Sequence, residues 1–340
     1  LHDALPILFD CIITAGFKET GKEGAEVEKQ LVEKIKEYGM RCVGPNCLGV
    51  VNTHPDVRMD GCFAESLPER GNIGFVSQSG ALGGGILNIL KDLNLGFAQF
   101  ISIGNQADVN AETALEYWEN DEDVKQILLY MESIQDPANF RKLATRITKK
   151  KPILALKSGR SAAGASAASS HTGSLAGADK AAAALLHQSG IIREFSLKNL
   201  FATAKVFSTC PIPKGDRVAI ITNSGGPGIM ATDAVCEYGM QMAKLTDATK
   251  DKLRSFLPSA ASVKNPVDMI ASAPIEHYKQ TLETVIADEN VDMIITIYLP
   301  FLGLKDIDVA KALMEIKAEH PEKPVIGVFM TKSEFFTKLS

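Results

Sequence analysis

The chain has 340 residues, of which 45% are apolar, enough for two or three folded domains with substantial cores. No apolar run reaches the roughly 18 residues that predict a membrane span, and the formal charge of −5 comes without a long basic block. These features argue against nucleic acid and membrane as partners.

Short apolar or β-branched runs alternate with helical stretches along the chain. The predicted strands are residues 11–16, 41–45, 72–77, 96–104, 126–132, 151–159, 217–226, 291–300 and 323–331. Amphipathic helices are predicted between them, for example over 24–39 and 308–320. Continuous apolar strands separated by such helices predict parallel sheets covered on both faces. The expected fold class is therefore α/β, with consecutive doubly wound parallel-sheet domains.

Two breaks interrupt this pattern. Residues 54–71 are polar, with two prolines and no clear periodicity, and residues 209–216 hold two prolines and a glycine. We predict domains at 1–60, 68–209 and 213–340. The second and third open alike, with a strand, a Ser-Gly turn and an apolar helix at similar spacing, which indicates one structural unit used twice. We also expect both ends of the chain to be incomplete.

Six cysteines are spread through the chain without a C-x-x-C pair or zinc-like spacing to histidine. We interpret them as reduced thiols of a cytoplasmic protein and expect no metal site. Cys47 lies in a Gly/Pro loop, and a nucleophilic role for it stays open as an alternative. No histidine motif supports that role.

Two strand-to-helix turns are candidates for anion binding, at 77–85 and 223–230. In open α/β folds the N-terminus of such a helix lies at the carboxyl edge of the sheet, where ligands bind. Its free N–H groups and positive dipole end suit a phosphate, and glycine lets the backbone approach closely. The alternative is an ordinary tight turn with Ser79 as the helix N-cap.

Residues 158–178 consist almost entirely of Ser, Gly, Ala and Thr, with His171 near the middle. Such composition is typical of a flexible linker. A neutral imidazole on a slack loop would also suit a phosphoryl carrier, since it can attack phosphorus at physiological pH. Glu132, at the end of a predicted strand, could orient that imidazole, or could be a solvated strand-end acid.

Nine ordered motifs resemble the ADP-forming acyl-CoA synthetases, which include ADP-forming acetate–CoA ligase and are related to succinyl-CoA synthetase. They are AGFKE (15–19), GPNCLGVVN (44–52), GFVSQSGALGG (74–84), SIGNQADV (102–109), LYMESIQDP (129–137), LALKSGRS (154–161), SSHTGSLAG (169–177), TNSGGPGIMATDA (222–234) and NPVDM (265–269). The likeness runs from about residue 9 to about residue 331. The ordered set is highly specific, although no single motif is.

This resemblance implies a partial Rossmann-like CoA-binding domain followed by two flavodoxin-like domains of the succinyl-CoA-synthetase type. It implies that His171 carries the phosphoryl group and that Glu132 pairs with it. The other implied site residues are the phosphate cradle Ser79, Gly80, Ser224, Gly225, Gly226 and Gly228, the CoA-binding residues Gly16, Phe17, Lys18, Gly44, Pro45 and Asn46, and the active-site wall Asn105, Asn265 and Asp268.

In that family, acyl-CoA and phosphate give an acyl phosphate and free CoA, and the phosphoryl group passes through the histidine to ADP. The resemblance therefore implies coenzyme A as cofactor and a small carboxylic acid or its acyl-CoA as substrate. No ATP-grasp module is present in the sequence. We expect a separate ATP-grasp subunit or a fused domain to bind ADP or ATP with Mg²⁺, and we expect an oligomer.

Three alternatives remain at this point. Related fusions carry an acetyltransferase domain that acetylates protein lysines, but many of those lose the histidine that this chain keeps. A non-catalytic acyl-CoA or nucleotide sensor is the second. The third is a nicotinamide-dependent oxidoreductase, for which the sequence lacks a G-x-G-x-x-G opening with an acidic residue about 20 positions on.

Overall fold

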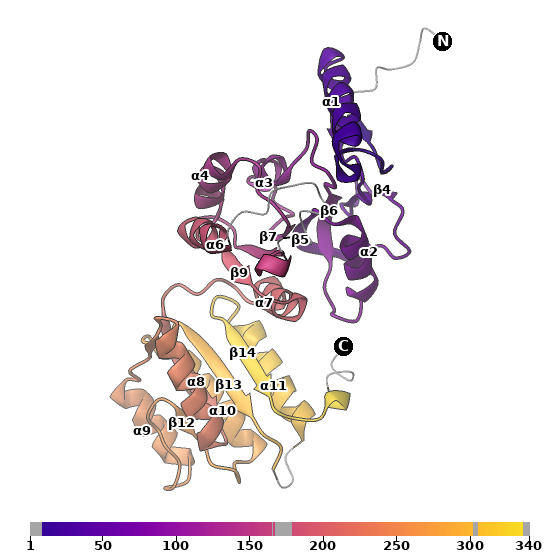
Figure 1. The fold of residues 1–340 in the computed structure, drawn as a ribbon. Coiled ribbons are helices and arrows are strands. Elements are labelled where there is room, and N and C mark those ends of the chain that lie inside the picture. The colour runs from indigo at the N-terminus through magenta and orange to yellow at the C-terminus, as the bar shows by residue number, and fades with distance from the viewer. Residues whose placement is uncertain (1–8, 165, 167–178, 302–304, 336–340) are drawn as a thin grey trace. The chain divides into compact units, whose positions relative to one another are not determined.

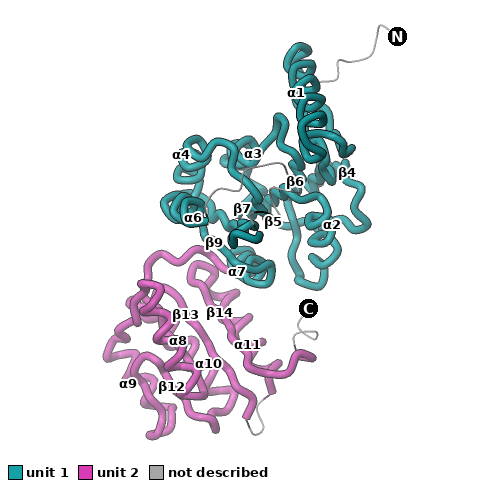
Figure 2. The backbone as a smooth tube through the Cα atoms, in the orientation of Figure 1, with its two compact units in different colours: residues 1–208 teal, residues 209–340 magenta. Residues whose placement is uncertain are grey.

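The computed structural model describes residues 9–164, 166, 179–301 and 305–335. The chain divides into two compact units, Leu1–Ser208 and Thr209–Ser340, whose elements are labelled in Figure 1 and whose extents are coloured in Figure 2. None of the described helices is both long and apolar enough to cross a membrane.

A small βαβ arrangement opens the first unit. Strand β1 (Phe9–Cys11) pairs in parallel with β2 (Arg41–Val43). The short 3-10 helix η1 (Lys18–Thr20) and the helix α1 (Lys22–Glu37) connect them. The amphipathic pattern over 24–39 therefore does form a helix. This helix connects two parallel strands, as the doubly wound prediction requires.

A seven-stranded sheet forms the centre of the first unit, in the order β4-β3-β6-β5-β7-β8-β9. Its strands are β3 (Gly49–Asn52), β4 (Met59–Cys62), β5 (Arg70–Ser77), β6 (Phe97–Ser102), β7 (Gln126–Met131), β8 (Ile153–Lys157) and β9 (Ile192–Glu194). The five strands β6, β5, β7, β8 and β9 run parallel to one another. The pairs β3–β6 and β3–β4 are antiparallel.

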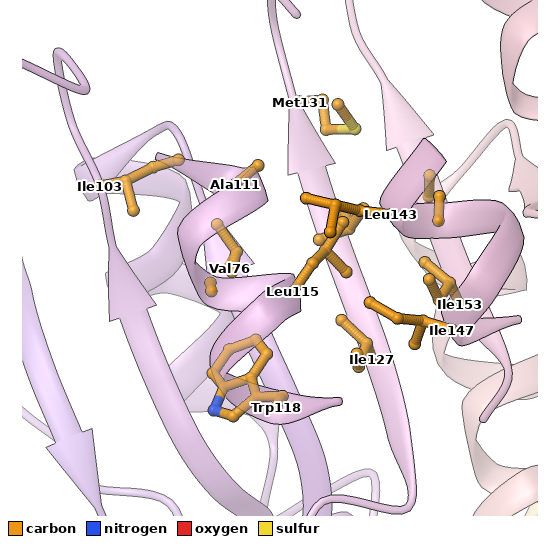
Figure 3. Close-up of a cluster of buried hydrophobic side chains, with 14 of the residues drawn as sticks. Val76, Ile103, Ala111, Leu115, Trp118, Ile127, Met131, Leu143, Ile147 and Ile153 are labelled. Carbon is orange, nitrogen blue, oxygen red and sulfur yellow. The ribbon is translucent and has the colours of Figure 1, made fainter. Parts of the chain in front are cut away.

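Helices pack against both faces of this sheet. They are α2 (Gly80–Ile89), α3 (Ala111–Trp118), α4 (Pro137–Ile147), α6 (Asp179–Gln188) and α7 (Leu197–Thr209). Along β7, Ile127 and Leu129 enter one buried core and Leu128 enters the other. Figure 3 shows the first core, in which Trp118 of α3 and Ile147 of α4 lie over the strands. A strand buried on both sides explains the continuous apolar runs in the sequence.

The second unit is a smaller parallel sheet in the order β11-β10-β13-β14, with β12 also pairing with β10. Its strands are β10 (Arg217–Thr222), β11 (Gln241–Met242), β12 (Val267–Asp268), β13 (Met293–Tyr298) and β14 (Val325–Phe329). Its helices are α8 (Gly225–Glu237), α9 (Asp247–Phe256), α10 (Ile275–Ile286) and α11 (Asp306–Glu319). Two separate buried clusters lie on its faces, one larger than the other.

The doubly wound α/β prediction is confirmed in both units, with one departure. Strand β3 lies within the predicted first domain, 1–60, and β4 begins at its end. Both strands nevertheless belong to the larger sheet, where they pair antiparallel. Strand β4 falls within the polar stretch 54–71, and its residues are mostly exposed. An edge strand of this kind needs no apolar periodicity, so the sequence gives no signal for it. The domain limits at 1–60, 68–209 and 213–340 stay a prediction.

Candidate active site

A cavity of about 460 Å³ lies in the first unit, lined by residues that directly follow β5, β6 and β7. Six of the predicted site residues line it together: Lys18, Asn46, Ser79, Gly80, Asn105 and Glu132. The carboxyl ends of parallel strands are where ligands bind in doubly wound sheets. The structure therefore brings predicted CoA-binding, phosphate-binding and catalytic positions to one cavity.

Two loops that are far apart in sequence form one wall of this cavity. The Asn105 N–H donates to the Pro45 carbonyl oxygen at 2.9 Å, and the Ala107 N–H donates to the Gly44 carbonyl oxygen at 3.0 Å. Gly104 allows this close approach, because its φ is +49° and a β-carbon there would lie 2.3 Å from the Pro45 oxygen. The predicted CoA loop is thus held against the predicted wall residue by main-chain contacts.

Replacing Gly104 with Ala is expected to lower the free energy of unfolding by about 2–4 kcal/mol, since the left-handed backbone and the collision with Pro45 both oppose a side chain. Urea denaturation of the parent protein and of the Gly104→Ala variant measures this difference. Gly85 in α2 is the matched control, since a β-carbon there would meet nothing within 4 Å. Gly85→Ala should raise stability by roughly 0.5–1 kcal/mol. Equal effects at the two positions would contradict the close-approach explanation.

A polar network fixes the side chains on this wall. The Lys18 ammonium pairs with the Glu28 carboxylate at 3.2 Å and also donates to the Asn105 carbonyl oxygen. Asn105 donates from Nδ2 to Glu19 at 2.5 Å and to Glu28 at 2.8 Å. Asn46 donates to the Asn105 Oδ1 atom at 3.3 Å. Asn105 is therefore the centre of the network, and it joins both predicted CoA motifs to the sheet.

Gly16 and Phe17 are not among the residues that line the cavity, but they contact one that is. Their N–H groups donate to the Glu19 carboxylate at 2.5 and 3.1 Å. Burial raises the pKa of Glu19, but hydrogen bonds from Asn105, Gly16 and Phe17 outweigh it and hold the pKa below its ordinary value. Glu19 is accordingly a charged carboxylate that lines the cavity near Lys18. Glu19 lies within the AGFKE motif but was not among the predicted site residues.

Cys47 also lines the cavity. Its sulfur lies 3.8 Å from the Cys11 sulfur and donates to the Ile12 carbonyl oxygen at 3.3 Å. Hydrogen bonding with Cys11 and burial raise the pKa of the Cys47 thiol far above its ordinary value. Since the thiolate is the nucleophilic form, this environment argues against the alternative in which Cys47 attacks substrate.

The helix α2 presents its N-terminus to the cavity through Ser79, Gly80 and Ala81. Ser79 is an N-cap, since its side chain accepts from the Leu82 N–H at 3.2 Å, as the tight-turn interpretation predicts. The first turn carries no acidic residue that would compete with an anion. Capping and phosphate binding are compatible, because an N-terminal helix turn offers several free N–H groups.

Glu132 follows β7 directly and is buried at the cavity wall. Gln78, which follows the adjacent strand β5, lies next to it and was not among the predicted site residues. The Gln78 Oε1 atom accepts from the N–H groups of Glu132 and Ser133 at 2.6 and 2.9 Å, and its Nε2 donates to the Ser133 carbonyl oxygen at 2.7 Å. The only sequence signal was its place between a strand and a Ser-Gly turn.

The second unit holds the remaining predicted cradle, at the start of α8. Ser224 is the residue before the helix, and its side chain makes no capping hydrogen bond. The N–H groups of the first turn are therefore not occupied by the Ser224 hydroxyl. Gly225, Gly226 and Gly228 lie in the first turn. A β-carbon on Gly225 would lie 3.3 Å from the Asp268 carboxylate, which places Asp268 beside this helix terminus.

Asn265, predicted as an active-site wall residue, is fully engaged with main chain in the second unit. Its Oδ1 atom accepts from the Ile220 N–H at 2.9 Å. Its Nδ2 atom donates to the carbonyl oxygens of Val218 and Ala243 at 2.7 and 3.0 Å. The side chain therefore bridges β10 and the residue after β11, and its place in an active-site wall stays a prediction.

His171 lies outside the described residues. Before it, β8 ends at Lys157, and after it, α6 begins at Asp179. Burial lowers the pKa of Lys157, whose ammonium donates to the Ser158 carbonyl oxygen at 2.6 Å. In the described parts of the chain, no three His, Cys, Asp or Glu side chains are grouped so that they could hold a metal ion.

Comparison with known proteins gives the family. Residues 70–207 match the succinyl-CoA ligase like flavodoxin domain, and residues 218–335 match the ligase-CoA domain. The alpha subunit of ADP-forming acetate–CoA ligase II from Pyrococcus furiosus is 45% identical over 322 residues, which cover 94% of this chain and 70% of that subunit. The chain belongs to the ADP-forming acyl-CoA synthetases.

Other members of this family agree in sequence and fold. The ADP-forming acetate–CoA ligase of Methanocaldococcus jannaschii is 42% identical over 94% of this chain and 45% of its own length. An acetyl-coenzyme A synthetase of Ca. Korarchaeum cryptofilum, solved in complex with phosphate and ADP, superposes with a TM-score of 0.90 at 33% identity, over 97% of this chain and 71% of that one. The chain thus spans 70% of the Pyrococcus furiosus alpha subunit and 45% of the Methanocaldococcus jannaschii ligase.

Proposed function

We propose that this chain supplies the acyl-CoA and phosphate half of an ADP-forming acid–CoA ligase. The observation that carries the proposal is the shared cavity. Lys18 and Asn46 from the predicted CoA motifs, the Ser79–Gly80 helix terminus and Glu132 all line one space of about 460 Å³. A thioester carbonyl, a phosphate and an imidazole must meet in such a space for the reaction to proceed.

The proposed first step joins phosphate to the acyl group. A phosphate oxygen attacks the thioester carbonyl carbon, the carbon–sulfur bond breaks, and the CoA thiolate leaves and takes up a proton. The free N–H groups at the start of α2 hold the phosphate. Each helix terminus contributes roughly 0.3–2 kcal/mol towards an anion.

The proposed second step moves the phosphoryl group to His171. An imidazole nitrogen attacks phosphorus, and the carboxylate of the acid leaves. Glu132 accepts a hydrogen bond from the other imidazole nitrogen and so fixes the tautomer that can attack. Since phosphoryl transfer depends mainly on positioning and charge stabilisation, the cavity needs no further nucleophile.

The proposed third step delivers the phosphoryl group from His171 to ADP on an ATP-grasp subunit or fused domain. Naming of the Pyrococcus furiosus relative as an alpha subunit supports a partner. In this scheme Mg²⁺ and the nucleotide bind at that partner, and the complete enzyme is a cytoplasmic oligomer. The substrate is a small carboxylic acid or its CoA thioester.

Labelling of the complete enzyme tests this function. The chain together with its ATP-grasp module is incubated with ATP labelled in the γ-phosphate and Mg²⁺, and peptides are mapped by mass spectrometry. We expect label on His171 that is lost at low pH and stable at high pH. Addition of the carboxylic acid substrate and CoA should discharge it. Absence of label from an enzyme that still binds acyl-CoA would favour the sensor alternative.

A further inference from the structure

The side chain of Gln78 continues the β5–β7 ladder beyond the point where the main chains separate. The last paired residues are Ser77 and Tyr130, followed by a bond from the Gln78 N–H to the Tyr130 carbonyl oxygen at 3.1 Å. The main chain then turns into α2 at Ser79 and Gly80. The Gln78 carboxamide takes the place of the departing strand and bonds to Glu132 and Ser133.

These contacts need a carboxamide. One oxygen accepts from two N–H groups while the nitrogen of the same plane donates to the Ser133 carbonyl oxygen. A carboxylate lacks the donor and would bring negative charge next to Glu132. An apolar side chain would leave the buried Glu132 N–H and the partly buried N–H and carbonyl of Ser133 without this partner, and the loss is costliest at the buried N–H.

The second unit repeats the arrangement. Asn223 is the residue before Ser224, as Gln78 is the residue before Ser79. Its carboxamide accepts from the Leu299 N–H at 3.0 Å and donates to the Leu299 carbonyl oxygen at 2.8 Å, just beyond β13. In both units a carboxamide at the strand-to-helix turn fastens the end of the neighbouring parallel strand.

We propose that Gln78 is a positioning residue for the phosphoryl transfer, holding Glu132 at a fixed place relative to the Ser79–Gly80 helix terminus. The proposal rests on the proposed function. The two units differ in the residue that the carboxamide holds. In the first unit Gln78 holds Glu132, the acid that pairs with His171 in the proposed function. A shift of about 1 Å between such groups can cost about 100-fold in rate.

The test uses the complete enzyme with its ATP-grasp module and measures acyl-CoA cleavage with phosphate and ADP. Gln78→Met should lower kcat by about 100-fold while the KM for acyl-CoA stays within about threefold. Gln78→Glu, which keeps the size of the side chain, should also lower kcat and serves where the Met variant fails to fold.

Gln126 is the matched control, because it is a buried glutamine on the same β7 strand but at its far end. Its Nε2 atom donates to the Ala204 carbonyl oxygen at 3.0 Å and to Ser208 at 2.7 Å. Gln126→Met should lower the melting temperature and leave kcat within about twofold of the parent. If both Met variants changed kcat and stability alike, Gln78 would have only a structural role.

A double-mutant cycle with Glu132→Gln separates positioning from general damage. Gln78→Met should cost about 100-fold in the parent but less than about threefold in the Glu132→Gln background. An equal cost in both backgrounds would overturn the proposal. If the parent enzyme formed phosphohistidine and Gln78→Met did so equally fast, only this inference would fail; if the parent formed none, the proposed function itself would fail.

Discussion

Replacing His171 with Asn is expected to abolish turnover of the complete enzyme, with a loss of at least about 10⁴-fold in kcat for acyl-CoA, phosphate and ADP. Asparagine cannot form the phosphoramidate bond through which the phosphoryl group must pass. Because the segment around position 171 consists of small residues, the fold should be retained. Steady-state kinetics, circular dichroism and the γ-labelling assay check the three parts of this expectation.

His187→Asn is the control for this change. His187 lies on α6 and is exposed. Its replacement should leave kcat within about twofold of the parent. A His171 variant that kept near-normal ligase rates would remove the carrier assignment and, with it, the proposed sequence of steps.

Replacing Glu132 with Gln is expected to slow phosphorylation of His171 by about 100-fold, because an amide no longer holds the imidazole in the reactive tautomer. The change keeps the size of the side chain and the main-chain bonds to Gln78, which come from N–H groups. The free energy of unfolding should therefore change by less than about 1 kcal/mol. Single-turnover labelling in a rapid-quench instrument measures the rate directly.

The exposed Glu116 on α3 supplies the comparison for Glu132. Glu116→Gln removes one negative charge from the same unit without touching the cavity, so its phosphorylation rate should match the parent. If both variants phosphorylated His171 at the parental rate, Glu132 would be a strand-end acid with no part in the chemistry.

The fold class could be predicted from sequence because the physical causes are local. Continuous apolar runs such as 126–132 require a strand that is buried on both faces, and Ile127 and Leu128 do enter opposite cores. The duplication was also readable, since each unit repeats a strand, a Ser-Gly turn and a helix. Strand β4 was not, because an exposed edge strand carries no periodic signal.

The candidate site was predicted in its motifs but not in its connections. Lys18, Asn46 and Asn105 each came from a separate motif, and only the structure places them around one cavity. Gln78 and Glu19 were missed because their importance lies in contacts to residues far away in sequence. A glutamine beside a turn predicts nothing by itself, and its bonds to Glu132 and Ser133 exist only once the two strand ends are side by side.

The interlocking of the two loops at Gly104 has a consequence for ligand binding and heat stability. The contacts from Asn105 to Pro45 and from Ala107 to Gly44 tie the small opening βαβ arrangement to the large sheet, and the cavity lies where they meet. A ligand that fills this space binds only when both parts are assembled, so its binding energy is added to the stability of the whole first unit. At a concentration 100 times the Kd, this linkage amounts to about 2.7 kcal/mol. A bound ligand is therefore expected to protect the first unit from heat unfolding and proteolysis.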